Sequence, residues 1–121
     1  MRPYSTEEIG MEIKSTALKR CDLLEVSGRV DSATADELMA AIKAVQDDGR
    51  YKIVLDLSGL QFMASKGWWT LIQAQKASKR YNRGEVLLAA VPDAIHESLD
   101  LVGISKLFRL FDDPVEAVGN F

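Results

Sequence analysis

The side chains that most often carry out covalent or metal chemistry are scarce in this sequence. It contains one histidine, His96, and one cysteine, Cys21, among 121 residues. A zinc site needs several ligands of these kinds at characteristic spacings, and a nucleophilic triad needs a histidine close to an activated serine or cysteine. No serine stands in a G-x-S-x-G turn, and both glycine-rich nucleotide-binding motifs are absent. We therefore predict a binding protein rather than an enzyme, with no catalytic residue, no metal and no cofactor.

Ser65 is the polar residue whose position has the clearest chemical meaning. It follows a predicted strand and loop, at the point where a helix is expected to begin. In one interpretation its hydroxyl is an N-cap that accepts a hydrogen bond from a backbone N–H group. In the other it is a phosphorylation site, because the unpaired N–H groups and the positive end of the helix dipole would stabilise a phosphate. The residues alone leave both interpretations open.

Asp56 is a carboxylate inside the apolar run from Ile53 to Leu57, which is predicted to be a central strand covered on both faces. A carboxylate near the end of such a strand needs hydrogen-bond partners, and the sheet edge or the following loop could supply them. Alternatively it shapes the loop that carries Ser65, because ligand sites in α/β sheets lie beyond the carboxyl ends of the strands. We assign Asp56 and Ser58 this loop-shaping role.

Helix-forming patterns predict the elements that must position these side chains. Thr34 and Glu37 have the spacing of a capping box, and Leu38, Ile42 and Val45 then recur at helical spacing. Two further helices are predicted, one from near Ser65 to about residue 81 and one that Asp93 would cap. Their expected buried stripes are Gly67, Leu71, Ala74, Ser78 and Tyr81, with Trp68 beside them, and Ile95, Leu99 and Val102.

Strands are predicted between these helices, at residues 11–17, 21–27, 53–57 and 86–91, with a short one within 104–110. Asp113 and Pro114 have the cap-then-proline order of a last helix start. Strands that alternate with helices imply a mixed sheet with parallel pairs and right-handed crossovers. We expect one α/β domain over residues 11–121, preceded by a flexible leader at residues 1–10.

The charge and hydropathy of the chain exclude several classes of protein. The formal net charge is −3 and the isoelectric point is about 5.1, with no basic run. We therefore expect no direct binding of nucleic acid, which usually requires a basic patch. No apolar run is long enough to cross a bilayer, and the first residues lack the apolar core of a signal peptide. We expect a cytoplasmic protein with no membrane insertion.

The segment from Ile53 to Gly67, IVLDLSGLQFMASKG, resembles the signature of STAS domains. That signature is an apolar strand ending in D-L-S, followed after a few residues by F-[IM]-D-[ST]-[ST]-G. Upstream, Val26 to Asp31 is similar to the family's apolar-x-G-x-apolar-D motif. The pattern continues downstream, so that the resemblance covers residues 11–119. It implies the STAS fold, a mixed sheet of four to five strands with about four helices packed mainly on one face.

At this length the resemblance is to anti-sigma factor antagonists, and it implies partner switching. The dephosphorylated domain would bind an anti-sigma factor that is also a serine kinase of the GHKL type, and would thereby free the sigma factor. The kinase would then phosphorylate the serine at the start of the second helix, which is Ser65 here. A PP2C-type phosphatase would reset the switch. The alternative is a STAS subunit that is not phosphorylated, in a signalling scaffold or a lipid-transport complex. We expect a monomer or a weak dimer.

The chain departs from the family signature beside the serine. The usual Asp before it is Ala64, and the usual Ser or Thr after it is Lys66. Lys66 would either stabilise a phosphate or clash with the usual partner. Trp68 and Trp69 replace small or aliphatic residues, and neighbours on a helix point about 100° apart. We therefore expect Trp68 to face inward and Trp69 to anchor a partner. The predicted partner-binding residues are Asp31, Ser32, Ala64, Lys66, Gly67 and Trp69.

Overall fold

A five-stranded mixed sheet organises residues 10–121, the part of the chain that the computed structural model describes. The strands are β1 (Met11–Ala17), β2 (Asp22–Val30), β3 (Lys52–Met63), β4 (Glu85–Ala89) and β5 (Leu110–Phe111). The helices are α2 (Ala35–Asp47), α3 (Ser65–Lys79), α4 (Asp93–Leu101) and α5 (Pro114–Val118), with 3-10 turns η1 (Arg80–Asn82) and η2 (Ser105–Leu107). The predicted leader lies outside the described residues, except for Gly10.

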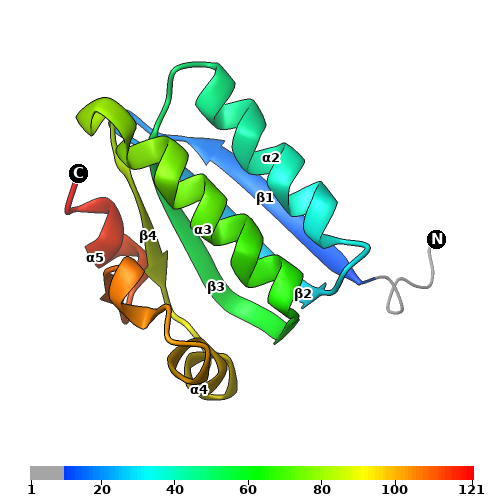
Figure 1. Cartoon of the computed structure of the whole chain (residues 1–121). Helices are drawn as coiled ribbons and strands as arrows, with labels where there is room; N and C mark the ends of the chain where they lie inside the picture. The colour runs from blue at the N-terminus through cyan, green and yellow to red at the C-terminus, as the bar shows by residue number, and fades with distance from the viewer. Residues whose placement is uncertain (1–9) are drawn as a thin grey trace.

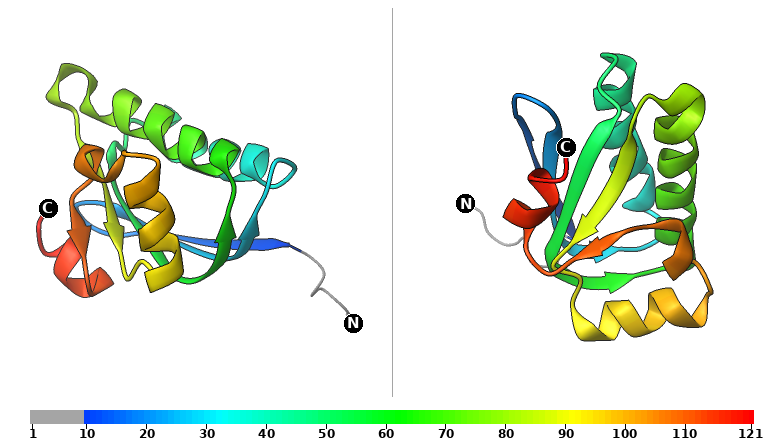
Figure 2. Two further views of the ribbon diagram at one scale, coloured as in Figure 1. Left: turned by 60° about the horizontal axis from the view of Figure 1, so that its bottom comes forward. Right: turned by 90° about the vertical axis from the view of Figure 1, so that its left-hand side faces the viewer.

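The strands lie in the sheet in the order in which they occur in the chain. β1 and β2 form an antiparallel hairpin, and every later neighbouring pair is parallel. Parallel neighbours require crossover connections, which α2, α3 and α4 supply. α2 and α3 lie side by side on one face of the sheet, α5 lies on the opposite face, and α4 lies beyond one end of α3 (Figure 1 and Figure 2). The predicted mixed sheet, with helices mainly on one face, is confirmed.

The first half of β3 is buried on both of its faces. Ile53, Leu55 and Leu57 belong to the main core together with residues of α2 and α3, whereas Val54 belongs to a second core that includes Ala117 of α5. All four of these β3 side chains have no exposed surface. Burying one aliphatic side chain of this size stabilises a fold by about 1.5–3 kcal/mol. The unbroken apolar run in the sequence therefore has the expected cause, cover on both faces.

β3 is nevertheless longer than predicted. It continues past residue 57 to Met63, through a segment that we expected to be a loop. Relative to β2, it carries one extra residue between Asp56 and Gly59 and another between Leu60 and Phe62. Such bulges break the alternation of buried and exposed side chains and bend the strand. Only Ala64 then separates β3 from α3.

Two residues predicted to complete buried helix stripes are exposed instead. Tyr81 is 83% exposed, because α3 ends at residue 79 and the backbone of Tyr81 is left-handed, with φ of 59°. Val102 is 50% exposed, because it is the C-cap of α4 rather than part of its last turn. In both helices the predicted buried stripe included one residue beyond the end of the helix.

The helix-capping predictions at the C-terminal half of the chain have mixed outcomes. The predicted cap at Asp93 is wrong. Asp93 is the first residue of α4, the N-cap of this helix is Pro92, and no side chain caps it. The predicted cap at Asp113 is confirmed, since its carboxylate accepts a hydrogen bond from the backbone N–H of Val115 at 2.8 Å. Pro114 stands at the first position of α5, where a missing N–H costs nothing.

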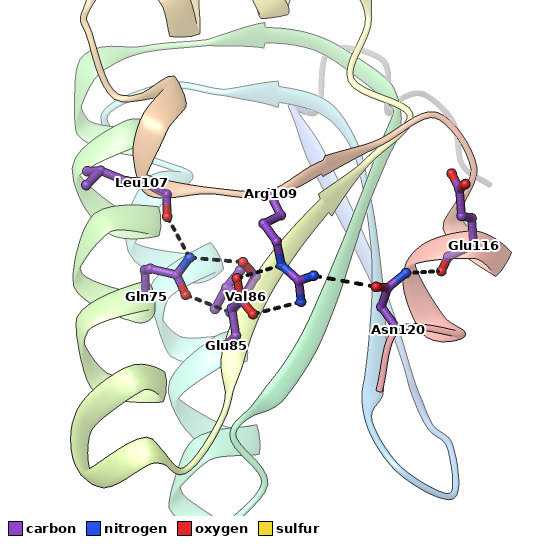
Figure 3. Close-up of polar contacts among 7 residues, drawn as sticks. All are labelled: Gln75, Glu85, Val86, Leu107, Arg109, Glu116 and Asn120. Atoms are coloured by element: carbon purple, nitrogen blue, oxygen red, sulfur yellow. Dashed lines mark hydrogen bonds and ion pairs between the residues drawn. The ribbon is translucent and has the colours of Figure 1, made fainter.

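Gln75 of α3 completes the sheet where β5 is too short to do so. β5 pairs only with Leu88 and Ala89, so Val86 needs another partner on that edge. The buried amide of Gln75 accepts a hydrogen bond from the Val86 N–H at 2.7 Å and donates to the Val86 carbonyl at 3.1 Å (Figure 3). It also donates to the carbonyl of Leu107 at 2.8 Å. One side chain therefore fixes α3 against β4 and against the segment that precedes β5.

Arg109 holds the same edge from the solvent side. Its guanidinium donates two hydrogen bonds to the carboxylate of Glu85, at 3.0 and 3.1 Å, and a longer one to Asn120 at 3.5 Å (Figure 3). The side chain of Asn120 in turn donates to the carbonyl of Glu116 at 3.0 Å. The hydrogen bonds to Glu85 raise the pKa of Arg109 above its ordinary value.

We expect Gln75→Leu to destabilise the protein by about 2–4 kcal/mol, because each buried polar group left without a partner costs about 1–3 kcal/mol. Urea unfolding at neutral pH measures the loss. Gln73→Leu, at a half-buried position of the same helix, is the control and should change the free energy of unfolding by less than about 1 kcal/mol. Equal losses in the two variants would contradict the role of the Gln75 amide.

Candidate partner-binding site

The residues predicted to bind a partner lie where β2 and β3 end and where α2 and α3 begin. Because β2 and β3 are parallel, their carboxyl ends meet at one edge of the sheet. The backbone N–H of Ala64 donates to the carbonyl of Val30 at 2.8 Å, which ties the turn after β3 to the end of β2. We call the exposed and half-buried residues of this region the Ser65 site: Asp31, Ser32, Ala64, Ser65, Lys66 and Trp69.

Asp31 organises the loop between β2 and α2. Its carboxylate accepts hydrogen bonds from the backbone N–H groups of Thr34 and Ala33, at 2.9 and 3.0 Å. These bonds, with the one from Thr34 the largest cause, hold the pKa of Asp31 below its ordinary value of 3.8. A carboxylate that accepts backbone bonds is stabilised in its charged form. The loop that faces Ser65 therefore has a fixed shape and a fixed negative charge.

The capping box predicted for Thr34 and Glu37 is wrong. Thr34 is the N-cap of α2, but its side chain makes no capping hydrogen bond to the helix. Its hydroxyl oxygen instead lies 2.9 Å from the carbonyl of Arg29 and accepts from the backbone N–H of Asp31 at 2.9 Å. The carboxylate of Asp31 accepts from the N–H of Thr34, which the Glu37 side chain would bond in a capping box, and the N–H of Glu37 donates to the backbone carbonyl of Thr34 at 3.0 Å instead of to its hydroxyl.

Ser65 is the first residue of α3, and its side chain is exposed. The N-cap is Ala64, and no side chain caps this helix, so the interpretation of Ser65 as an N-cap is wrong. α3 is 15 residues long and carries no acidic residue in its first turn. The unpaired N–H groups at such a helix start carry a partial positive charge. Ser65 is thus accessible, and the start of α3 favours an added negative group.

Lys66 bridges the starts of the two helices. Its ammonium lies 3.1 Å from the carboxylate of Asp36 and donates to the carbonyl of Ser32 at 3.3 Å. The sequence analysis did not identify Asp36 as the counterion, because the charge pairing depends on how α2 and α3 lie together. The two side chains are 46% and 76% exposed, and an exposed pair of this kind contributes only about 0–1 kcal/mol.

Gly67 lies beneath the surface, so its predicted contact with a partner is wrong. It is buried, and a Cβ atom at this position would overlap the sulfur of Met63 and lie 2.8 Å from Val30 Cγ1. The missing side chain lets the first turn of α3 approach the ends of β2 and β3. Gly67 therefore positions Ser65 and Lys66 rather than meeting a partner itself.

The two tryptophans of α3 face opposite environments. Trp68 is 3% exposed, and its indole N–H donates to the hydroxyl of Ser98 in α4 at 3.4 Å. Trp69 is 57% exposed and lies one turn after Ser65. The inward direction of Trp68 and the exposure of Trp69 agree with the sequence analysis. A large aromatic surface therefore stands beside the serine, where a partner can cover it.

Arg29 and Phe62 form an exposed pair at the ends of β2 and β3, and the sequence analysis missed both. They pair in register at the ends of β2 and β3, and the guanidinium carbon of Arg29 lies 4.4 Å from the centroid of the Phe62 ring. Phe62 is 38% exposed. Simple alternation along the strand could not have placed this ring, because the bulges of β3 shift which residues face solvent.

Asp56 and Ser58 do not belong to the Ser65 site. Asp56 accepts a hydrogen bond from the backbone N–H of Ser58 at 3.0 Å, as expected for a carboxylate in this position, but both residues lie within β3 rather than in a loop. They line an open hollow of about 410 Å³ together with Glu12, Lys14 and Glu25 of β1 and β2. The prediction that they shape the loop of Ser65 is therefore wrong; they shape the first bulge.

Other possible sites were also considered over residues 10–121. No three His, Cys, Asp or Glu side chains in this range come together in a way that could hold a metal ion. His96 is half-buried and contacts Asp100 at 3.2 Å, and Cys21 is buried. No helix in this range is long and apolar enough to cross a membrane.

The fold and the site can now be compared with known proteins. The STAS domain model matches residues 12–117. The chain belongs to the STAS domain family. This STAS domain is 31% identical over 97 residues to an anti-sigma F factor antagonist from Paenibacillus polymyxa. The aligned residues cover 79% of this chain and 82% of the relative. An anti-sigma factor antagonist from Mycobacterium paratuberculosis has a similar structure, with a TM-score of 0.82 and 26% identity over 92% of this chain and 93% of that one.

A third likeness concerns the fold alone. SpoIIAA, a Bacillus cell fate determinant, has been solved in its phosphorylated form; it gives a TM-score of 0.71 at 14% identity, over 90% of this STAS domain and 98% of that chain. The resemblance inferred from the sequence is thus confirmed, together with the fold that it implies. The relatives are named as regulators that oppose anti-sigma factors. The roles of Ser65, Lys66 and Trp69 stay predictions.

We expect Asp31 to contribute to the acid sensitivity of the STAS domain. Its pKa is lower in the folded state, so its contribution to stability is fully present above about pH 4, near the ordinary value. The contribution is lost as the pH falls through the lower, folded value. Asp31→Asn should therefore lose less stability than the unmodified protein between pH 5 and about pH 2, as measured by urea unfolding at a series of pH values. Parallel pH profiles would count against this role.

Proposed function

We propose that this STAS domain is an anti-sigma factor antagonist that works by partner switching. In its unphosphorylated form it would bind an anti-sigma factor of the GHKL kinase type through the Ser65 site. Phosphorylation of Ser65 would release the partner, and a PP2C-type phosphatase would restore binding. The observation that carries this proposal is the position of Ser65, exposed on the first turn of α3 between the Asp31 loop and Trp69.

The chemistry of the switch is a phosphoryl transfer. The hydroxyl oxygen of Ser65 would form a bond to the γ-phosphorus of ATP, the bond from that phosphorus to ADP would break, and the hydroxyl proton would leave. The phosphate adds nearly two negative charges and three acceptor oxygens. The N–H groups at the start of α3 can receive it without unfolding the helix. The change would therefore act on the partner, through the charge of the surface.

Trp69 would supply much of the binding energy. An aromatic side chain that is more than half exposed in the free protein has a large area to bury, and tryptophan is enriched among residues that dominate interfaces. Because Trp69 lies one helical turn from Ser65, a partner that covers the ring would also meet a phosphate on Ser65. Binding and release would then use the same surface.

A STAS subunit that is not phosphorylated is the second candidate. Ala64 favours it, because a carboxylate that the family usually has at this position is missing. The two candidates share the fold and the Ser65 site, and they differ only in whether a kinase modifies the serine. One experiment can therefore separate them.

We expect incubation with ATP and the GHKL-type kinase that binds this protein to add one phosphate, seen by intact mass and mapped to Ser65 by fragmentation. Ser65→Ala should remove the signal, whereas Ser32→Ala, at another exposed serine of the site, should keep it. The phosphorylated protein should bind the kinase at least about tenfold more weakly, because of repulsion and desolvation of the new charge. Tight binding without any phosphate on Ser65 would favour the second candidate.

We expect Trp69→Ala to weaken binding of the anti-sigma factor by about thirtyfold, the effect of losing an interface residue that contributes about 2 kcal/mol. Isothermal titration calorimetry with the purified partner measures it. Tyr81→Ala is the matched control, because Tyr81 is an exposed aromatic residue just beyond the other end of α3. If the two variants bound equally well, the anchor role of Trp69 would be wrong.

A further inference from the structure

Basic side chains gather at the end of the sheet opposite to the Ser65 site. There, where β2 and β3 begin, a cavity of about 150 Å³ is lined by four cationic side chains, Arg20, Arg50, Lys52 and Arg83. The single carboxylate in its wall is Asp22. The cavity thus carries an excess of three positive charges, four minus one, in a protein whose net charge is −3.

Asp22 does not neutralise this excess, because its carboxylate is already paired with Arg50. Asp22 is 4% exposed, and its carboxylate is hydrogen-bonded to Arg50 Nε. Arg50 Nη2 donates to the carbonyl oxygens of Leu18 and Cys21, at 2.6 and 3.1 Å. These contacts hold the guanidinium in one place at the base of the cavity and leave three cations without a carboxylate in the wall.

Arg83 is also fixed before any ligand arrives. Its guanidinium donates to the carbonyls of Ala77 and Arg80, at 2.7 and 3.1 Å, and its central carbon lies 3.7 Å from the centroid of the Tyr51 ring. A guanidinium held on an aromatic face has little freedom left to lose when it binds an anion. The nearest carboxylate along the chain, Glu85, is engaged by Arg109.

We propose that this cavity binds a phosphate group. The cavity is small, about 150 Å³, and open to solvent, and the excess of positive charge in its wall suits a compact oxyanion. Guanidinium groups match the geometry of phosphate oxygens, and Lys52 and Arg20 are exposed at the rim to draw the anion in. The phosphate is either a free or soluble phosphorylated compound or the headgroup of a lipid. This inference does not depend on the switch at Ser65.

The test is an NMR titration of the full chain with inorganic phosphate, at constant ionic strength set with chloride. We expect saturable shifts at the amides of Gly49 and Tyr51, with a dissociation constant on the order of 1 mM. The double variant R20Q/K52Q should weaken binding about tenfold or more, since two charged contacts are lost. The control K14Q/K106Q removes the same charge from exposed lysines that do not line the cavity and should stay within about twofold. Arg50 is left intact because it pairs with a buried carboxylate.

Shifts that do not saturate, that chloride alone reproduces, or that both double variants weaken equally would overturn the proposal. So would binding of a 20-base oligonucleotide without saturable binding of phosphate, because the basic end would then recognise nucleic acid. Co-sedimentation with phosphatidylcholine vesicles that contain phosphatidic acid, lost in R20Q/K52Q, would assign the phosphate to a lipid headgroup. Saturable phosphate binding without co-sedimentation would assign it to a soluble ligand.

Discussion

The double burial of β3 is the constraint on which the other features of this structure depend. α2 and α3 cover one face of the strand and α5 covers the other, so residues 53–57 are aliphatic and buried except for Asp56. Functional groups are consequently found at its two ends. Lys52 at the start lines the basic cavity, and Met63 at the end leads through one residue to Ser65. A slip of β3 by one residue would move its side chains from one core into the other, where the neighbours differ, and this fixes both ends of the strand in space.

Helical periodicity and the apolar run of β3 were sufficient to predict the order of the elements, and the motif around Ser65 was sufficient to predict the family. The failures arose where two local signals competed. The S/T-x-x-E spacing at Thr34 is real, but the carboxylate of Asp31 accepts from the N–H of Thr34, the group that the Glu37 side chain of a capping box would bond. Bulges in β3 resemble a loop in sequence because they break the alternation on which strand prediction depends. Likewise, nothing in the sequence shows that Gln75 replaces a missing stretch of β5.

The basic cavity could not be predicted for a different reason, which is the distance between its parts in the sequence. The turn between β1 and β2, the connection from α2 to β3 and the connection from α3 to β4 meet because all three lead into the amino ends of neighbouring strands. An isoelectric point of about 5.1 argues against an overall basic protein. It does not argue against four cations at one end, two of them held in place, because fields at short range follow local charge rather than the total.

The pairing of Lys66 is compatible with the proposed phosphorylation of Ser65, although the family signature has a neutral hydroxyl at this position. Its ammonium is shared between a carbonyl and the exposed carboxylate of Asp36, and a pair in that position contributes about 1 kcal/mol at most. A phosphate on the neighbouring residue would carry nearly twice the charge of a carboxylate and would lie at the positive end of α3. The phosphate would therefore compete well for Lys66. Capture of Lys66 by the phosphate would free Asp36 at the start of α2. The surface that the partner has to cover would then carry a second uncompensated negative charge.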